Sequence, residues 1–319
     1  MKILIFAHVD QYVDDLSQCK NFNQVQTYFV KKHLLKLGVD VVVQPAAGWL
    51  GVKKQTKSTW YNFVQNVDTS LLNNYDAILF TGAIPTKKTS PTIMKWLNDN
   101  YKGVLAEFNE RSKPPSTDLL FFALPASESA RCKWIGPLYD SDCLYPEQQY
   151  DKLIIHIDHH YPGREDSSEK IKRLIEELPN NKIFQQGWKG YEIYYHSKKI
   201  NDLENFDFYN PPPNTAFANL SRIYRSTHVG FLSHRETLGM YPVEIVACGG
   251  VVAVLDELHL TPAIANIIDV EWGEENFWNR VLPKLTSDLA HVRSQRVSNF
   301  SYKHGIARVY DYINTFSTK

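Results

Sequence analysis

Residues 221–255 read SRIYRSTHVGFLSHRETLGMYPVEIVACGGVVAVL, and this stretch decides the fold expected for the chain. Its apolar residues predict a buried strand at 228–233, and a helix follows after a polar turn. The pair Gly249-Gly250 ends that helix, and the Val-rich run 251–255 predicts a second strand. Strand, helix and strand in this order form a β-α-β crossover, in which the two strands are parallel.

Two glutamates, Glu236 and Glu244, are separated by seven residues within this unit. We expect Glu236 in the turn after the strand and Glu244 further along the helix. The first N–H groups of that helix, near Leu238, Gly239 and Met240, point back to the strand end. Such N–H groups attract anions and carboxylates accept hydrogen bonds, so the pattern favours a ligand with phosphates and hydroxyls, such as a nucleotide sugar. The alternative is a capped helix with two solvated glutamates.

The composition indicates a globular protein of two domains. The chain has 319 residues, of which 43% are hydrophobic, and its 35 Lys+Arg balance 35 Asp+Glu, so it lacks the overall basic charge of many nucleic-acid-binding proteins. The four cysteines show no metal-ligand spacing, and we expect reduced thiols in a cytoplasmic protein. The N-terminus MKILIFAHVD predicts a strand rather than a signal peptide, and no run approaches the ~20 apolar residues of a membrane span. We therefore expect no stable membrane insertion.

Two series of strands and helices follow one another along the chain. The first series has expected strands at 2–7, 39–43, 77–81, 103–108 and 119–124, with helices at 23–37 and 92–100. From Arg131 the pattern loosens, which indicates the exit from this domain. The second series has expected strands at 152–157, 182–185, 191–196 and 206–209, with a helix at 168–178. We expect domains at 1–148 and 149–295, and a helical tail at 296–319 that folds back on the first domain.

Two such halves with a cleft between them resemble the architecture of GT-B glycosyltransferases. Residues 221–255 resemble in particular the family-4 retaining members, which carry a strand, an E-x7-E block, a glycine turn and another apolar strand. Three further motifs resemble that family: Gly163-Arg164 followed by Lys170, IGPLYDSDCLYPEQ (135–148) and FSYKHGIARVYDYI (300–313). The resemblance implies an α/β fold of two Rossmann-like domains facing a cleft, with the C-terminal helix returning to the first domain.

The same resemblance implies roles for several residues. Arg164 and Lys170, next to Gly163, would neutralise the donor diphosphate as it leaves. Glu236 would bind sugar hydroxyls and act in catalysis, and Glu244 would bind the nucleotide ribose. The backbone N–H groups of Leu238, Gly239 and Met240 would face the sugar or the phosphates. The donor would be an NDP-sugar, with UDP favoured, and no other cofactor or metal is implied. For Arg164 and Lys170, a solvated helix start is the alternative.

The acceptor side departs from the family pattern. The first loop, AHVDQ (7–11), has no glycine, although the family usually has a pair there. The family often has a histidine at the end of the fourth strand, where this chain has EFNER (107–111). Glu107, Asn109 or Glu110 could replace that histidine as the acceptor-side catalytic group. His8 is another candidate in the cleft, although a lone histidine is more often a buried or surface residue.

Basic segments in the first domain suggest an anionic acceptor. Residues 1–133 contain 16 Lys+Arg against 11 Asp+Glu, although the whole chain is neutral. The candidate acceptor-binding or DNA-binding residues are Lys53, Lys54, Lys57, Lys87, Lys88 and Arg111. A basic patch next to aromatic residues suits such an acceptor. Ordinary solubilising lysines are the alternative.

Three segments are similar to the DNA α-glucosyltransferases of T-even-type phages: IPTKKTSPTIMKWLNDNY (84–101), YPGREDSSEK (161–170) and YPVEIVACGGVVAV (241–254). This similarity implies a hydroxymethylated pyrimidine in double-stranded DNA as the acceptor, and the host cytoplasm as the location. The rival acceptors are a surface polysaccharide or a lipid-linked glycan. A nucleotide-binding module with a degenerate site is also an alternative, because fold alone does not settle function. No G-x-G-x-x-G follows a strand, which argues against a Rossmann oxidoreductase.

Overall fold

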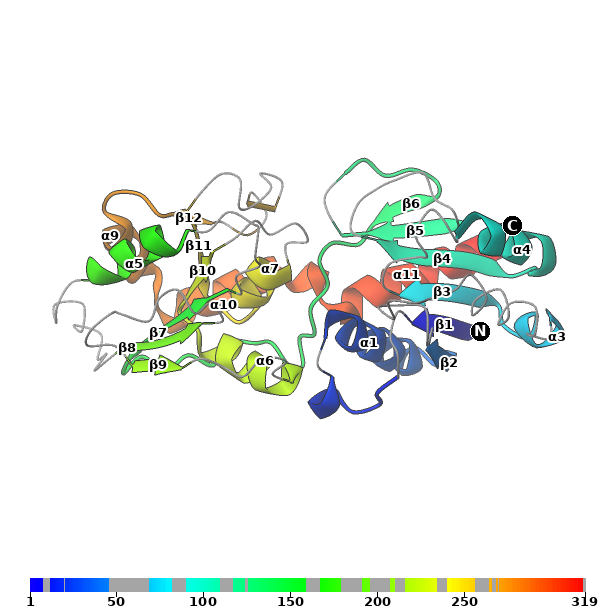
Figure 1. The fold of residues 1–319 in the computed structure, drawn as a ribbon, viewed down its shortest axis with the longest axis horizontal. Coiled ribbons are helices and arrows are strands. Elements are labelled where there is room, and N and C mark those ends of the chain that lie inside the picture. Colours follow the sequence, from blue (N-terminus) through cyan, green and yellow to red (C-terminus); the bar gives the residue numbers. More distant parts are fainter. Residues whose placement is uncertain are drawn as a thin grey trace. The chain divides into compact units, whose positions relative to one another are not determined.

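The computed structural model describes residues 1–7, 12–19, 21–45, 69–81, 90–109, 117–123, 126–158, 167–178, 191–195, 207–209, 216–233, 240–255, 264–265, 268 and 270–317. These residues form two compact units, Met1–Gly136 with Tyr302–Lys319, and Pro137–Ser301. Each unit is built around a parallel sheet with helices (Figure 1), so the predicted fold class of two α/β domains is confirmed.

The sheet of the first domain has the strand order β2-β1-β3-β4-β5-β6, and all of its neighbouring strands are parallel. Its strands are β1 (Lys2–Ala7), β2 (Asp40–Pro45), β3 (Ala77–Thr81), β4 (Val104–Asn109), β5 (Leu119–Phe122) and β6 (Cys132–Trp134). The helices described in this domain are α1 (Phe22–Lys36), α3 (Thr69–Leu72), α4 (Ser90–Asn100) and α11 (Tyr302–Ser317). The C-terminal helix α11 contacts α1 and β4.

Strand β6 was not predicted from the sequence, because the pattern loosens from Arg131 onward. Residues 132–134 pair with β5 in parallel, and the Trp134 indole N–H donates to the Ala123 carbonyl at 2.8 Å. A strand of three residues shows too few alternations for a periodicity signal.

The sheet of the second domain has the order β12-β11-β10-β7-β8-β9, again with all neighbouring strands parallel. Its strands are β7 (Leu153–Ile157), β8 (Tyr191–Tyr195), β9 (Asp207–Tyr209), β10 (Val229–Leu232), β11 (Val251–Val254) and β12 (Glu271–Trp272). Its helices are α5 (Ser168–Glu176), α6 (Phe217–Ser226), α7 (Met240–Ala247), α9 (Phe277–Val281) and α10 (Ser287–Arg296). The expected strand at 182–185 lies outside the described residues.

Residues 221–255 fold as predicted. Strand β10 is followed by α7, and β11 pairs with β10 in parallel. Gly249 ends α7 in the left-handed region at φ +84°, with its N–H donating to Val246 O at 2.9 Å. The N–H of Gly250 donates to Ile245 O at 2.9 Å, so the two glycines satisfy the last carbonyls of the helix.

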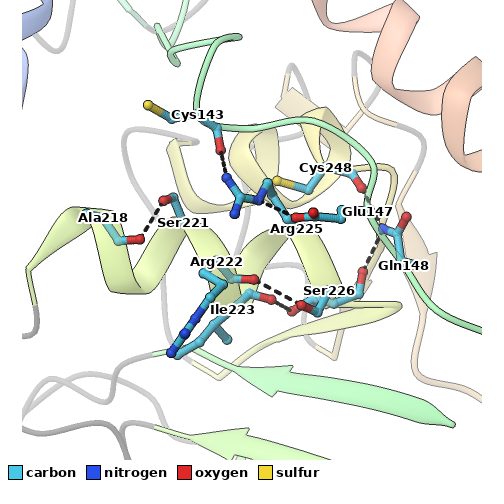
Figure 2. A network of polar contacts seen from close by, with 11 residues as sticks. Cys143, Glu147, Gln148, Ala218, Ser221, Arg222, Ile223, Arg225, Ser226 and Cys248 are labelled. Atoms are coloured by element: carbon cyan, nitrogen blue, oxygen red, sulfur yellow. Dashed lines mark hydrogen bonds and ion pairs between the residues drawn. The ribbon is translucent and has the colours of Figure 1, made fainter.

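The boundary between the domains lies twelve residues before the expected position at residue 148, because residues 137–148 belong to the second unit. Figure 2 shows the polar contacts of this segment with α6 and with the end of α7. Arg225 on α6 pairs with Glu147 at 2.7 Å and donates to the Cys143 carbonyl at 3.4 Å. The Gln148 amide donates to the carbonyls of Thr227 and Cys248 at 3.0 and 2.5 Å. These contacts are between residues far apart in sequence, and composition alone does not reveal them.

Candidate active site

The second sheet has a topological switch point between β7 and β10. Counted along the chain from β7, its strands have the order 3-2-1-4-5-6, which is common in nucleotide-binding sheets. Chain connections leave β7 and β10 toward opposite sides of the sheet, and ligands of such sheets bind outside the carboxyl ends of these two strands. The segments that follow these strands, 159–166 and 234–239, contain Gly163, Arg164, Glu236, Leu238 and Gly239.

The ends of β7 and β10 are tied together by polar contacts. The Asp158 N–H donates to Phe231 O at 3.1 Å, and the Ser233 hydroxyl donates to Asp158 O at 3.0 Å. The N–H of Ser167, at the start of α5, donates to Ser233 O at 3.3 Å. Both Asp158 and Ser233 are buried. The sequence interpretation did not single out these two residues, although Asp158 follows directly after a predicted strand.

Helix α5 brings Lys170 to the carboxyl edge of the same sheet. Its Nζ donates to Leu255 O at 3.2 Å, directly after β11. The Lys170 side chain is exposed, whereas Ile171 and Leu174 are buried in the core. The ammonium group is therefore held at the sheet edge while it remains accessible to an anionic ligand.

Helix α7 follows the switch point and carries Glu244. Met240 is its first residue, and Glu244 lies about one turn further along and is half-buried. The neighbouring Tyr224 hydroxyl is fully buried, and burial, with the Glu244 and Asp158 charges, raises its pKa well above the ordinary value. Burial, with the same two carboxylates, also raises the pKa of Tyr241. The charges of Glu244 and Asp158 therefore both act on the same two buried tyrosine hydroxyls.

The first sheet has its own switch point between β1 and β3. There the Thr27 and Thr81 hydroxyls are buried and hydrogen-bonded to each other at 2.9 Å. Glu107 on β4 is fully buried and accepts a hydrogen bond from the Thr117 hydroxyl at 3.3 Å. Asn109 is half-buried at the end of β4.

Most of the expected site residues lie outside the described residues. These are His8, Glu110, Gly163, Arg164, Glu236, Leu238 and Gly239 among the catalytic and donor-binding candidates, and Lys53, Lys54, Lys57, Lys87, Lys88 and Arg111 among the acceptor-binding candidates. Among the expected residues, the structure therefore places Lys170, Met240 and Glu244 on the donor side, and Glu107 and Asn109 on the acceptor side. It adds Asp158 and Ser233, which the strand order identifies.

The described part of the chain holds no group of three or more His, Cys, Asp or Glu side chains that could bind a metal ion. None of the described helices is long and apolar enough to cross a membrane.

No protein-family model and no curated protein sequence matches this chain. Solved structures do match it in fold. Sucrose-phosphate synthase from Thermosynechococcus elongatus matches with a TM-score of 0.60 and 13% identity, over 100% of this chain and 99% of that chain. The glycosyltransferase AviGT4 of avilamycin A biosynthesis matches with a TM-score of 0.58 and 10% identity, over 99% and 98%.

UDP-GlcNAc 2-epimerase from Neisseria meningitidis, solved with UDP-GlcNAc bound, matches with a TM-score of 0.59 and 10% identity, over 99% of this chain and 100% of that chain. At identities this low, likeness shows the fold alone. The chain has the two-domain GT-B fold found in these glycosyltransferases and in the epimerase.

Proposed function

We propose that the chain is a retaining glycosyltransferase that moves a sugar from a nucleotide sugar, with UDP as the favoured nucleotide, to a hydroxyl group. The observation that carries this proposal is Lys170, which is held at the carboxyl edge of a sheet with a nucleotide-binding strand order. The full-length likeness in fold to glycosyltransferases supports it.

The proposed reaction breaks the bond between the anomeric carbon and the phosphate oxygen of the donor. It forms a bond from the same carbon to the acceptor oxygen, and the acceptor proton passes to the departing phosphate or to solvent. Negative charge grows on the diphosphate as it leaves, and a fixed cation at that position stabilises the transition state. Lys170 and Arg164 supply this charge in the proposed mechanism.

Glu244 and Glu236 are the proposed acceptors of hydrogen bonds from the ribose and the transferred sugar. The N–H groups at the start of α7, including that of Met240, are proposed to face the sugar or the phosphates. With Lys170 and Arg164 neutralising the diphosphate, the proposed mechanism has no obligatory metal and no further cofactor.

The favoured acceptor is a hydroxymethylated pyrimidine in double-stranded DNA. Support comes from the basic segments of the first domain and from the similarity of three segments to phage DNA α-glucosyltransferases. An enzyme of this kind must reach the hydroxymethyl group through a groove or flip the base out of the stack. A surface polysaccharide and a lipid-linked glycan are the other acceptors, and a degenerate nucleotide-binding module is the non-enzymatic alternative.

A second candidate function is nucleotide-sugar epimerisation. It is favoured by one observation, namely that the UDP-GlcNAc 2-epimerase matches with a TM-score of 0.59, close to the 0.60 of sucrose-phosphate synthase. Both functions use a nucleotide sugar, but only the transferase moves the sugar to an acceptor hydroxyl.

The test is a transfer assay with a panel of UDP- and GDP-sugars. The acceptors are duplexes containing 5-hydroxymethylcytosine, 5-hydroxymethyluracil or unmodified cytosine, and mass spectrometry of the nucleosides detects the added sugar. Transfer to one modified base alone supports the proposal and identifies both substrates. Slow donor hydrolysis without transfer to DNA indicates a glycosyltransferase whose acceptor is a glycan or lipid. Conversion of the donor to its 2-epimer favours the epimerase, and no reaction favours the binding module.

A further inference from the structure

The two strands at the switch point present different residues to the two faces of the second sheet. Ile155 and Ile157 on β7, with Val229 and Phe231 on β10, belong to the core that also contains residues of α5 and α9. His156 and Gly230 alternate with them and therefore face the opposite side. They are also partners in the register of β7 and β10. This opposite face contacts α6 and α7.

On that face His156 is hydrogen-bonded to Tyr241, the second residue of α7. His156 Nδ1 lies 2.8 Å from the Tyr241 hydroxyl, which lies 3.3 Å from the His156 carbonyl oxygen. Both contacts are hydrogen bonds when Nδ1–H donates to the hydroxyl and the hydroxyl donates to the carbonyl. One tyrosine hydroxyl is therefore held at two points of a central strand.

Gly230 has no side chain, and this leaves room for the Tyr241 hydroxyl beside β10. A Cβ atom at Gly230 would lie 2.8 Å from the Tyr241 hydroxyl and 3.0 Å from Ile245 Cγ1, both on α7. A glycine costs stability in the interior of a strand, and here it permits close approach of the helix. His156, Gly230 and Tyr241 form a unit that we call the α7 clamp.

The clamp adjoins the proposed nucleotide site. Tyr241 and Glu244 are three residues apart on α7, and such residues are neighbours on a helix surface. The Tyr224 ring on α6 packs edge-on against both His156 and Tyr241, with centroids 5.1 and 5.7 Å away. Apart from Glu244, α7 consists of apolar residues and Tyr241, and the Tyr241 hydroxyl makes directional contacts with the central strand β7.

We propose that the hydrogen bond between His156 and Tyr241 is a positioning contact for nucleotide binding, which sets where α7 places Glu244 and its own first N–H groups. The inference rests on the proposed function, because it assumes that α7 contacts the nucleotide. His156 and Tyr241 are then positioning residues that act through Glu244, and neither contacts the ligand.

The test removes only the hydroxyl group of Tyr241. Tyr241→Phe keeps the buried ring and removes both hydrogen bonds, and UDP binding is measured by calorimetry together with the melting temperature. We expect the Kd for UDP to rise about tenfold, because a small displacement of α7 weakens several polar contacts to the nucleotide at once. The matched control is Tyr101→Phe in the first domain, which also removes a buried hydroxyl hydrogen bond, to Tyr75 O at 2.9 Å. We expect that control to leave the Kd unchanged.

A double-mutant cycle separates positioning from general destabilisation. If the clamp acts partly through Glu244, Tyr241→Phe costs less affinity in a Glu244→Gln background than in the wild type, and the two losses are not additive. Three results would each overturn the inference: additive losses of UDP affinity in the cycle, equal losses in Tyr241→Phe and Tyr101→Phe, or no loss in Tyr241→Phe. In all three cases, UDP binding by the wild type would leave the proposed function intact. A folded wild type that binds no UDP would overturn both.

Discussion

His228 makes the stability of the second domain depend on pH. It directly precedes β10, and its Nδ1 accepts a hydrogen bond from the Ile154 N–H at 3.1 Å. The ring is buried, and its edge packs against Tyr150. Burial lowers the pKa of His228 from 6.5 to about 4, with the positive charge of Arg293 adding to the effect and hydrogen bonding to the backbone of Gln149 opposing it. Protonation of Nδ1 would also remove the acceptor of the Ile154 bond.

The direction of this pH dependence follows from the pKa of His228, which is 6.5 in the unfolded chain and about 4 in the folded chain. Between pH 6.5 and pH 4 the unfolded chain binds a proton at this ring and the folded chain does not, so stability is lost as the pH falls through this window. Linkage gives a loss of about 2 kcal/mol at pH 5 relative to pH 8, and about 3 kcal/mol at pH 4 and below. Above pH 6.5 His228 contributes no pH dependence.

The assay is urea unfolding at pH 5, 6, 7 and 8, for the wild type and for His228→Asn. Asparagine retains a polar acceptor near the Nδ1 position but does not titrate, so we expect the variant to be less stable at pH 8 and to lose about 2 kcal/mol less between pH 8 and pH 5. The control His291→Asn changes an exposed histidine of the same domain and should keep the wild-type slope. Equal slopes for the wild type and His228→Asn would show that protonation of His228 does not destabilise the second domain.

Three further outcomes are expected. Glu244→Ala weakens UDP binding at least about tenfold in calorimetry, because a buried carboxylate–hydroxyl bond contributes ~1.5–3 kcal/mol; an unchanged Kd contradicts the proposed ribose contact. Gly230→Ala lowers the free energy of unfolding by about 1–3 kcal/mol, because its Cβ overpacks against Tyr241; a variant with wild-type urea stability contradicts the close approach. Excess EDTA leaves the transfer rate unchanged, because Lys170 and Arg164 supply the positive charge; a loss that added Mg²⁺ or Mn²⁺ restores contradicts the metal-independent mechanism.

Much of the fold could be predicted because the central strands of both sheets are almost completely buried. Strands such as β3 and β7 are apolar except for Thr81 and His156, and they were expected within a residue of their bounds. The region around α7 was also predictable, because two adjacent glycines mark the end of the helix before a Val-rich strand. Lys170 could be anticipated at the sheet edge only through a resemblance to known enzymes.

The remaining features depend on contacts between distant parts of the chain. The order of the strands, which identifies Asp158 and Ser233 as switch-point residues, is not encoded in any local pattern. His156 and Tyr241 are 85 residues apart in sequence. Each alone has the appearance of an ordinary core residue, and only the register of β7 and β10 explains why Gly230 lies beside them.

In the proposed function, the chain cleaves a nucleotide sugar with Lys170 at the departing diphosphate. The most direct measurement is release of UDP from UDP-sugars in the presence of the acceptor panel, for the wild type and for Lys170→Met, which keeps the length of the side chain and removes its charge. We predict release by the wild type and a rate about a hundredfold lower in the variant, with an unchanged melting temperature. Equal rates in the two proteins, or no release of any nucleotide by folded wild type, would contradict the account.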